Sequence, residues 1–433
     1  MTPAARLQAA IEVLEALERT AQPADRFLRD YFRARRYAGS KDRAAVGERV
    51  FSVFRHRASL AWRMESESPR ALVIASLLAE GLDADVIADL FHGEGHAPKP
   101  LTQEERTSIA HGSGSEPPVA VRGEYPAFLQ DELVRAFGPA LLDEMIAMQA
   151  RAPIDLRANT LKASAGAILA ALRADGFDAH PARFAPDGIR IHSGEGLSVL
   201  SRHTLFQSGA FEFQDEAAQI ASLLGGARPG ERVLDLAAGA GGKALALAAR
   251  MQNEGEIVAC DIRGAALREL ESRAARAGAT IIHTALLNGA PPDGPFDLAF
   301  VDAPCSGSGV WRRQPELRWR LATDRLTELT ALQDRLLDQA ADRVAAGGRL
   351  LYATCSVLPL ENKDRIDAFL ARHRDFRLEP VHLLWRALFP RAPVLPGDGD
   401  VFMASPLTTG TDGFFTASLT RGQSRVTVGD GPG

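Results

Sequence analysis

The sequence contains few cysteines, no long apolar run and no excess of positive charge. Among its 433 residues only Cys260, Cys305 and Cys355 are cysteines, an odd number without metal-ligand spacing. This argues against a disulfide framework and a zinc site, so we expect reduced thiols, a cytoplasmic protein and no bound metal. No apolar stretch reaches about 18 residues, and we therefore expect no membrane-spanning helix. With 50 basic and 55 acidic residues, the overall charge does not indicate nucleic acid.

Positive charge is nevertheless concentrated near the N-terminus. Between Arg26 and Arg63 there are eleven basic residues and three acids, interleaved with aromatic side chains. Neutralisation of phosphate supplies most non-specific affinity for nucleic acid, so this local excess favours an RNA-binding surface. A solvated arginine-rich face is the competing interpretation. Apolar residues at helical spacing run through residues 1–92, which predicts an all-α domain there.

Composition and periodicity divide the remainder of the chain. Residues 93–124 are rich in Gly, Pro, Ser and His, which predicts a linker. Residues 125–212 alternate short helices and strands, which predicts a small α+β RNA-binding module with Arg157 as a candidate phosphate ligand. Residues 213–421 alternate strands and helices in the pattern of a doubly wound, mostly parallel sheet. We expect residues 422–433 to form a tail that is disordered from Val426 onward.

The predicted elements of the third domain can be stated individually. We expect strands at 232–236, 256–261, 280–284, 296–302 and 349–354, helices at 242–251, 264–277, 323–346 and 361–373, and a closing hairpin from 400–404 and 413–419.

A glycine-rich turn follows the first of these strands. Val233 to Leu236 leads into Ala237-Ala238-Gly239-Ala240-Gly241-Gly242-Lys243, and the second strand ends at Asp261. In a βαβ unit the glycines let the backbone approach a nucleotide, and the second-strand acid binds ribose hydroxyls. The same residues satisfy a loose dinucleotide pattern, so an NAD-dependent oxidoreductase remains an alternative at this point.

Two of the three cysteines are placed for chemistry. Cys305 follows Pro304 after one predicted strand, and Cys355 follows another, so both should emerge at the edge that holds the nucleotide. A thiolate that adds beside an unactivated aromatic carbon makes the ring able to attack a methyl group, and a base must later remove a proton so that the sulfur can leave. Cys260 lies within a strand and is expected to be a buried structural thiol.

These motifs resemble those of the RsmB / Nop2/Sun family of S-adenosylmethionine-dependent RNA cytosine-C5 methyltransferases. The resemblance covers about residues 125–419, and the N-terminal helices look, more weakly, like the NusB-like RNA-binding domain of bacterial members. The matching segments are Val233-Leu234-Asp235-Leu236 with Gly241-Gly242-Lys243, Asp302-Ala303-Pro304-Cys305-Ser306-Gly307-Ser308-Gly309, Tyr352-Ala353-Thr354-Cys355-Ser356 with Glu361-Asn362, and Phe213-Gln214-Asp215-Glu216-Ala217-Ala218-Gln219 upstream.

The resemblance implies a Rossmann-like class I methyltransferase domain with assigned roles. Cys355 would attack C6 of cytosine, and Cys305 would act after methyl transfer. Lys243 would lie near the reacting centre, and Asp302 would contact the cytosine or the donor. Main chain from Ala237 through Ala238, Gly239, Ala240 and Gly241 to Gly242 would line the donor, and Asp261 would bind its ribose. The family carries an acid after the third strand where this chain has none, so Asn288 is the candidate replacement.

A loop after the Cys305 motif is rich in arginine and tryptophan. Trp311, Arg312 and Arg313 combine an aromatic plane with cations, which is what unstacked RNA bases and phosphates require. The competing interpretation is a surface loop whose tryptophans pack on the next helix. Together the motifs predict an rRNA cytosine-C5 methyltransferase that uses S-adenosylmethionine, and we expect a monomer. The missing third-strand acid leaves a non-catalytic RNA-binding assembly factor as the alternative.

Overall fold

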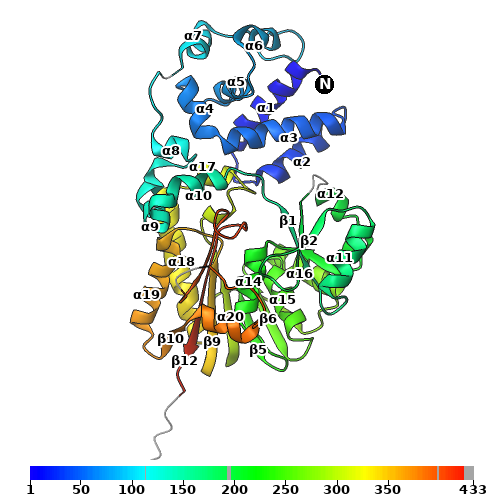
Figure 1. Cartoon of the computed structure of the whole chain (residues 1–433), viewed down its shortest axis with the longest axis vertical. Coiled ribbons are helices and arrows are strands. Elements are labelled where there is room, and N and C mark those ends of the chain that lie inside the picture. Colours follow the sequence, from blue (N-terminus) through cyan, green and yellow to red (C-terminus); the bar gives the residue numbers. More distant parts are fainter. Residues whose placement is uncertain (113, 193–196, 397–398, 424–433) are drawn as a thin grey trace, which may run out of the picture. The chain divides into compact units, whose positions relative to one another are not determined.

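The chain forms two compact units in the computed structural model (Figure 1). The structure describes residues 1–112, 114–192, 197–396 and 399–423, so most of the predicted tail lies outside the described residues. The first unit comprises Met1–Arg151 together with Val310–Leu321, and the second comprises Ala152–Gly309 and Ala322–Gly433. Within the described residues no helix is both long enough and apolar enough to cross a membrane.

The first unit is helical, as predicted. One buried core of aliphatic and aromatic side chains joins its helices between residues 3 and 111, and Val13, Val46, Val50 and Val73 in it have no exposed surface. Thr2 caps the start of helix α1, because its hydroxyl accepts a hydrogen bond from Ala5 N–H. Its α-helices are α1 (Pro3–Leu17), α2 (Ala24–Arg33), α3 (Ser40–Arg55), α4 (Arg57–Met64), α5 (Pro69–Ala79), α6 (Ala84–Leu90), α7 (Gln103–His111), α8 (Val119–Arg122), α9 (Gln130–Phe137), α10 (Leu141–Ala147) and α17 (Glu316–Arg320).

The region predicted as a linker contains two of these helices, α7 and α8, so that prediction was wrong. A capping box starts α7: Glu105 N–H donates to the Thr102 hydroxyl at 3.1 Å, and Thr102 N–H donates to the Glu105 carboxylate at 2.8 Å. Leu101 and Ile109 are buried in the helical core. Helices α9 and α10 also belong to this unit, which ends at Arg151, whereas we expected the α+β module to begin at residue 125.

The second unit opens with the expected small α+β module. Four strands form an antiparallel sheet in the order β2-β3-β1-β4, and its buried face packs on side chains of α11 such as Ile168 and Leu172. Its elements are β1 (Ile154–Ala158), α11 (Ala165–Ala174), β2 (Ala179–Pro181), β3 (Gly188–Ile191), α12 (Leu197–Leu200), α13 (Thr204–Gln207) and β4 (Phe211–Phe213).

The large sheet confirms the doubly wound prediction. Its strand order is β10-β12-β9-β8-β5-β6-β7, with β11 paired to β12. The five strands from β9 to β7 are mutually parallel, and β10, β11 and β12 are antiparallel to their partners. Buried clusters cover both faces, which suits apolar strands of a parallel sheet. The strands are β5 (Arg232–Leu236), β6 (Glu256–Asp261), β7 (Ile282–Leu286), β8 (Phe296–Asp302), β9 (Val344–Thr354), β10 (Phe376–Glu379), β11 (Phe402–Ala404) and β12 (Phe414–Arg421).

Helices flank this sheet, and several boundaries differ from prediction. The helices are α14 (Glu216–Leu224), α15 (Gly242–Arg250), α16 (Gly264–Ala277), α18 (Thr323–Ala341), α19 (Lys363–Arg372) and α20 (Val381–Leu388). Helix α18 stops five residues early because Val344 pairs with Phe296 and already belongs to β9. The third strand was placed two residues too early in the prediction. The closing hairpin of β11 and β12 is confirmed.

Candidate active site

The glycine-rich turn after β5 forms a main-chain cradle. Ala237, Gly239 and Gly241 have φ values of 75°, 57° and 82°, in the left-handed region that favours glycine. Ala238 N–H donates to Cys260 O at 2.8 Å, which fixes the turn beside β6. A Cβ on Gly241 would lie 1.9 Å from Leu270, so glycine there also permits helix packing. The turn is therefore fixed, half-buried, at the carboxyl end of β5.

Asp261 ends β6 and is tied to this turn. Its carboxylate accepts hydrogen bonds from Gly239 N–H at 2.9 Å and from Arg263 N–H at 2.8 Å. Burial opposes its charge, but the bonds from Arg263 and Gly239 hold its pKa below the ordinary value. The Arg263 guanidinium adds two further hydrogen bonds and is itself 66% exposed. Asp261 is thus an ionised acceptor at the position expected for a ribose ligand.

Asn288 lies on the same edge of the sheet. It follows the end of β7 by two residues and is exposed. The preceding Leu287 N–H donates to Asp261 O at 3.0 Å, which brings this segment alongside the second-strand acid. The glycine-rich turn, the Asp261 carboxylate and the segment of Asn288 therefore lie at one edge of the sheet, and this set fits a nucleoside with ribose hydroxyls and a polar base.

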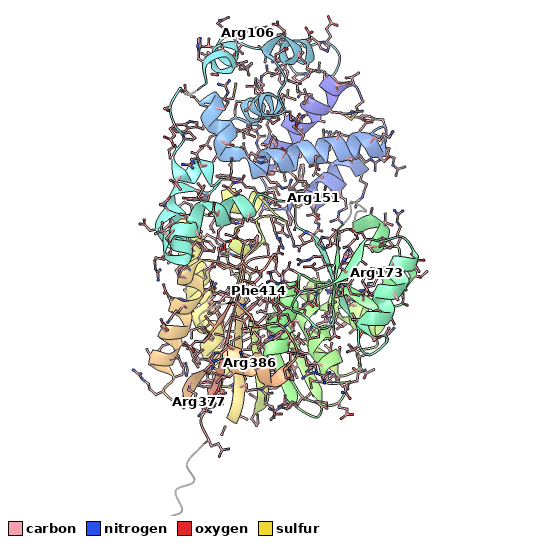
Figure 2. All side chains as sticks on the ribbon, viewed as in Figure 1. Arg106, Arg151, Arg173, Arg377, Arg386 and Phe414 are labelled. Carbon is pink, nitrogen blue, oxygen red and sulfur yellow. The ribbon has the colours of Figure 1, made fainter. Side chains whose placement is uncertain are left out.

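Lys243 and Asp302 form an ion pair at the rim. Lys243 Nζ lies 2.5 Å from Asp302 Oδ2, joining the first turn of α15 to the end of β8. Although burial opposes the lysine's charge, Asp302 and, less strongly, the Cys355 sulfur raise the Lys243 pKa. The ammonium also lies 5.2 Å from the ring centre of Phe414, which Figure 2 labels. The lysine is therefore held in its charged form.

Cys305 and Cys355 meet at this rim, as their positions after two strands predicted. Their sulfurs are 3.4 Å apart, and both side chains are half-buried. The contact follows from the sheet, because β8 and β9 are parallel neighbours with Asp302 opposite Ala353. The hydrogen bond to Cys355 and burial raise the pKa of Cys305 well above its ordinary value. Cys260 is fully buried, and burial raises its pKa to about 12, which suits the structural role expected for it.

The structure adds Asp235 to the residues near this rim. Asp235 is fully buried in β5, and burial, followed by the charge of Asp302, raises its pKa to about 7. The sequence placed Asp235 at a strand end but gave no sign of this environment. Asp235 is buried because side chains cover both faces of the sheet, and the local sequence pattern around Asp235 cannot show this.

Three of the four residues predicted to bind RNA do not present a binding surface. Trp311 is fully buried and Arg312 is 5% exposed, so the prediction for this loop must be corrected. The Arg318 guanidinium lies 4.9 Å from the Trp311 ring centre, inside the helical unit. Arg157 is 6% exposed and donates to Gln214 Oε1 at 2.6 Å. Arg313 alone retains partial exposure.

Family models and known relatives agree with the geometry of the rim. The model described as 16S rRNA methyltransferase RsmB/F matches residues 223–420, and a ferredoxin-like domain model of RsmF/B-like methyltransferases matches residues 125–197. The latter match includes α9 and α10, which pack in the helical unit. The NusB-like assignment of the helical unit stays a prediction.

Individual proteins show the same similarity. The probable ribosomal RNA small subunit methyltransferase B of Bacillus subtilis is 30% identical, over 74% of this chain and 72% of its own length. Ribosomal RNA small subunit methyltransferase B of Pseudomonas syringae is 35% identical, over 69% and 66% respectively. The crystal structure of PH0851 is 25% identical and covers 97% of this chain and 99% of its own, with a TM-score of 0.75. The chain therefore belongs to the RsmB/F family of 16S rRNA methyltransferases, and its methyl donor is S-adenosylmethionine.

Proposed function

We propose that this protein methylates C5 of a cytosine in RNA, with small-subunit ribosomal RNA in the bacterial cytoplasm as the substrate. The observation that carries the proposal is the contact of two half-buried thiols, 3.4 Å apart, beside the Lys243–Asp302 pair. The relatives named above are small-subunit rRNA methyltransferases, which supports the choice of RNA. An NAD-dependent oxidoreductase gives no role to these thiols, and family membership leaves no support for it.

The residues of the rim would act in sequence on the cytosine. Cys355 as thiolate forms a bond to C6, and the electron pair moves into the ring so that C5 becomes nucleophilic. When bound, S-adenosylmethionine would offer C5 an electrophilic methyl group, whose bond to the donor sulfur would break and leave a neutral thioether. Cys305 then assists removal of the C5 proton, the C5–C6 double bond re-forms, and Cys355 leaves as thiolate. Lys243 and Asp302 orient the base and balance the charge that develops on it.

The donor would lie across the cradle at the strand ends. Main chain from Ala237 to Gly242 would contact it, and Asp261 would accept hydrogen bonds from its ribose. The Arg263 guanidinium now occupies the Asp261 carboxylate from the solvent side, and its 66% exposure allows ribose hydroxyls to replace it there. Asn288 would take the polar edge of the adenine in place of the acid that this chain lacks.

Substitution of each cysteine tests these roles. Protein-free 16S rRNA and methyl-labelled S-adenosylmethionine should yield labelled 5-methylcytidine, and Cys355→Ala should abolish it because no thiolate reaches C6. Cys305→Ala should instead accumulate an RNA complex that survives denaturing electrophoresis. Cys260→Ala is the matched control and should retain the label.

Other outcomes would decide against the proposal. A covalent complex formed by the Cys355 variant would reverse the two roles. Failure of the wild-type protein to bind the donor would favour the non-catalytic assembly factor instead, since the cradle would then be vestigial.

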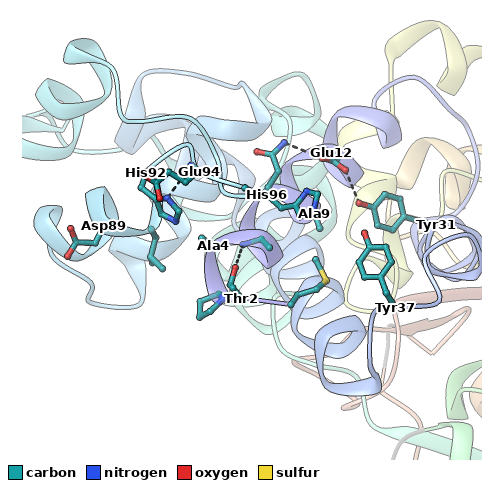
Figure 3. A pocket seen from close by; sticks show the side chains of 16 residues that line it. Thr2, Ala4, Ala9, Glu12, Tyr31, Tyr37, Asp89, His92, Glu94 and His96 are labelled. Atoms are coloured by element: carbon teal, nitrogen blue, oxygen red, sulfur yellow. Dashed lines mark hydrogen bonds between the residues drawn. The ribbon is translucent and has the colours of Figure 1, made fainter.

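The helical unit supplies a further proposed RNA contact at the turn between α2 and α3. Arg36 lies in this turn, and Lys41 and Arg43 lie in the adjoining first turn of α3. All three are exposed and have no ion pair among the residues that the structure describes. Tyr37 between them is 73% exposed and offers a plane for an unpaired base. Tyr31 is not available in the same way, because Arg35 covers its ring at 3.6 Å and its hydroxyl donates to Glu12. Both tyrosines line a hollow of about 750 Å³. Figure 3 labels them among the side chains that line it.

The salt dependence of RNA binding tests this turn. Replacing Arg36 and Lys41 by alanine should lower the slope of log affinity against log salt by about 1.5, because two phosphate contacts are lost. The double variant Arg29→Ala, Arg33→Ala is the control, since these arginines already pair with Asp25 and Asp30 at 3.0 and 2.8 Å. Equal slopes for the two double variants would rule out the turn as a phosphate site.

A further inference from the structure

One buried carboxylate joins the turns that carry the two cysteines. Glu361, at the end of a short 3-10 helix, has no exposed surface. Its Oε1 accepts hydrogen bonds from Ser306 N–H at 2.8 Å and from Gln333 Nε2 at 3.1 Å. Its Oε2 accepts from the hydroxyls of Ser306 and Ser356, each at 2.5 Å. Ser306 follows Cys305 and Ser356 follows Cys355, so the residue after each thiol is held by the same side chain.

Further hydrogen bonds strengthen this connection. Gln333 also donates to Pro304 O at 3.0 Å, immediately before Cys305. Ser308 Oγ lies 2.9 Å from Ser356 Oγ and accepts from Val357 N–H at 2.9 Å. Gly309 N–H donates to Cys355 O at 2.9 Å. The two turns are thus bonded directly as well as through Glu361.

The next residue, Asn362, fixes the Cys355 turn from its other side. Thr354 Oγ1 donates to Asn362 Oδ1 at 2.6 Å, and Asn362 Nδ2 donates to Ser356 O at 2.9 Å. Cys355 therefore lies between Thr354 and Ser356, which are both hydrogen-bonded to the side-chain amide of Asn362. Its backbone has little freedom to shift along β9.

The chemistry of Glu361 suits a brace that fixes position. The four groups that donate to it are uncharged, and each of its oxygens accepts two of them, which fills the acceptor capacity of a carboxylate. A buried carboxylate is costly unless it is fully hydrogen-bonded, and those bonds are directional. Apolar packing of the same volume would bury as much surface without fixing the angle or spacing of the two turns.

We propose that Glu361 is the positioning residue that holds Cys305 and Cys355 at contact distance, so that both thiols can act on one cytosine. The role in methylation rests on the proposed function above, whereas the spacing of the thiols does not. The charge of Glu361 also contributes, after the Cys355 hydrogen bond and burial, to the raised pKa of Cys305. Loss of the charge alone should therefore change the pKa of Cys305, whereas loss of the hydrogen bonds should change the spacing of the two thiols.

Two substitutions distinguish position from charge. Glu361→Ala removes all four hydrogen bonds. Glu361→Gln keeps an acceptor oxygen for Ser306 N–H and Gln333, and its amide can donate to the hydroxyls of Ser306 and Ser356, which can rotate to accept. If Glu361 acts by fixing the positions of the two turns, Glu361→Ala should lose the close spacing of the thiols and Glu361→Gln should keep it.

A thiol–disulfide equilibrium measures the spacing without RNA or donor. The protein is equilibrated with reduced and oxidised glutathione, so that one oxidised glutathione takes the two thiol hydrogens and yields two reduced glutathiones and a Cys305–Cys355 disulfide. Acid quenching, alkylation and intact mass give the ratio of disulfide to dithiol. Glu361→Ala should lower the equilibrium constant by about tenfold or more, because the thiols no longer share a fixed geometry. Glu361→Gln should stay near the wild-type value.

Cys260 serves as an internal control for folding. It is fully buried, so it should resist alkylation under native conditions in each folded variant. If Glu361→Ala alkylates at Cys260, then Ser356→Ala, which removes only the hydroxyl on the Cys355 side, takes its place and should lower the constant severalfold. An unchanged constant in the folded alanine or serine variant would overturn the proposal. Equal losses in the alanine and glutamine variants would also overturn it, because charge would then be the cause.

A second readout connects the brace to methylation. On the Cys305→Ala background, Glu361→Ala should slow formation of the RNA complex by up to about 100-fold while donor binding is retained, since a misplacement of about 1 Å can cost that much. An unchanged rate would show that Glu361 does not position Cys355 for attack. If the wild-type protein makes no complex but the glutathione equilibrium shifts as expected, the proposed function fails and the brace stands.

Discussion

Asp235, near the end of β5, is a fully buried acid with an unusually high pKa. Its pKa is about 7 in the folded protein against an ordinary value of 3.8, because burial and then Asp302 disfavour the charge. The folded state therefore holds the Asp235 proton more tightly than the unfolded chain does. Stability from this group is fully present below about pH 4 and is lost as the pH rises to about 7.

Replacing Asp235 by asparagine should remove this loss. We expect the free energy of unfolding of Asp235→Asn, relative to wild type, to rise between pH 4 and pH 7 by at most about 4 kcal/mol, because the two pKa values differ by about three pH units. Denaturant unfolding at several pH values measures it, with the exposed Asp293→Asn as control. Parallel pH profiles for wild type and Asp235→Asn would contradict the expectation.

The sequence predicted the positions of some functional residues and not the roles or burial of others. Asp302 ends a strand and Cys305 and Cys355 follow strands. A parallel sheet brings strand ends to one edge, so their meeting was predictable from order alone. Glu361 stood in a recognisable motif, but its role depends on two turns that only the folded sheet brings together. Trp311 looked like a stacking platform because composition does not reveal which side of a loop is buried.

At the scale of elements, the segment Val310–Leu321 belongs to the helical unit although the chain on both sides of it belongs to the other unit. Glu316 Oε1 accepts from Ala24 N–H at 3.0 Å and so caps the start of α2. Arg318 donates to Glu124 O at 2.6 Å, and Trp319 Nε1 donates to Phe54 O at 2.7 Å. Arg318 and Trp319 therefore stabilise helices instead of presenting a surface to RNA.

Removing the first tryptophan of the segment should lower the stability of the protein markedly. Trp311→Ala should reduce the free energy of unfolding by about 3–5 kcal/mol, since it empties a fully buried aromatic site. Chemical denaturation followed by circular dichroism measures the loss. Gln314→Ala is the control in the same segment, because its side chain is exposed and should change stability by less than about 0.5 kcal/mol. Similar losses for both variants would contradict the role of Trp311 as a core residue.

At the scale of elements the prediction succeeded where the pattern was strong. The strands β5, β6 and β8 and the helix α16 have the predicted bounds, since each is a continuous apolar run or a long amphipathic period. Helix α7 was missed because only its capping box and two apolar residues distinguish it from a loop. The end of α18 was misplaced because pairing across the sheet, which is not local, decided it.

At the scale of the whole molecule, the helical unit is built from two pieces of chain that are far apart in sequence. We expect residues 152–433 expressed alone to aggregate, because Trp311, Arg318 and Trp319 lose the partners that bury and bond them. Size-exclusion chromatography would show this, and co-expression with residues 1–151 should restore a soluble complex. A monomeric fragment with a cooperative unfolding transition would contradict the expectation. RNA binding by the helical unit is accordingly tested with point variants and not by deletion.

The same discontinuity bears on the order in which the protein matures during synthesis. Domains usually fold as they leave the ribosome, beginning from the N-terminus. Here the cap of α2 and the anchor at Glu124 come from residues 316–320 of 433, after both the small module and the first half of the large sheet. The helical unit is the first to emerge, yet it cannot be completed until the ribosome has passed Cys305, so its final packing waits for synthesis of the segment that follows the Cys305 motif.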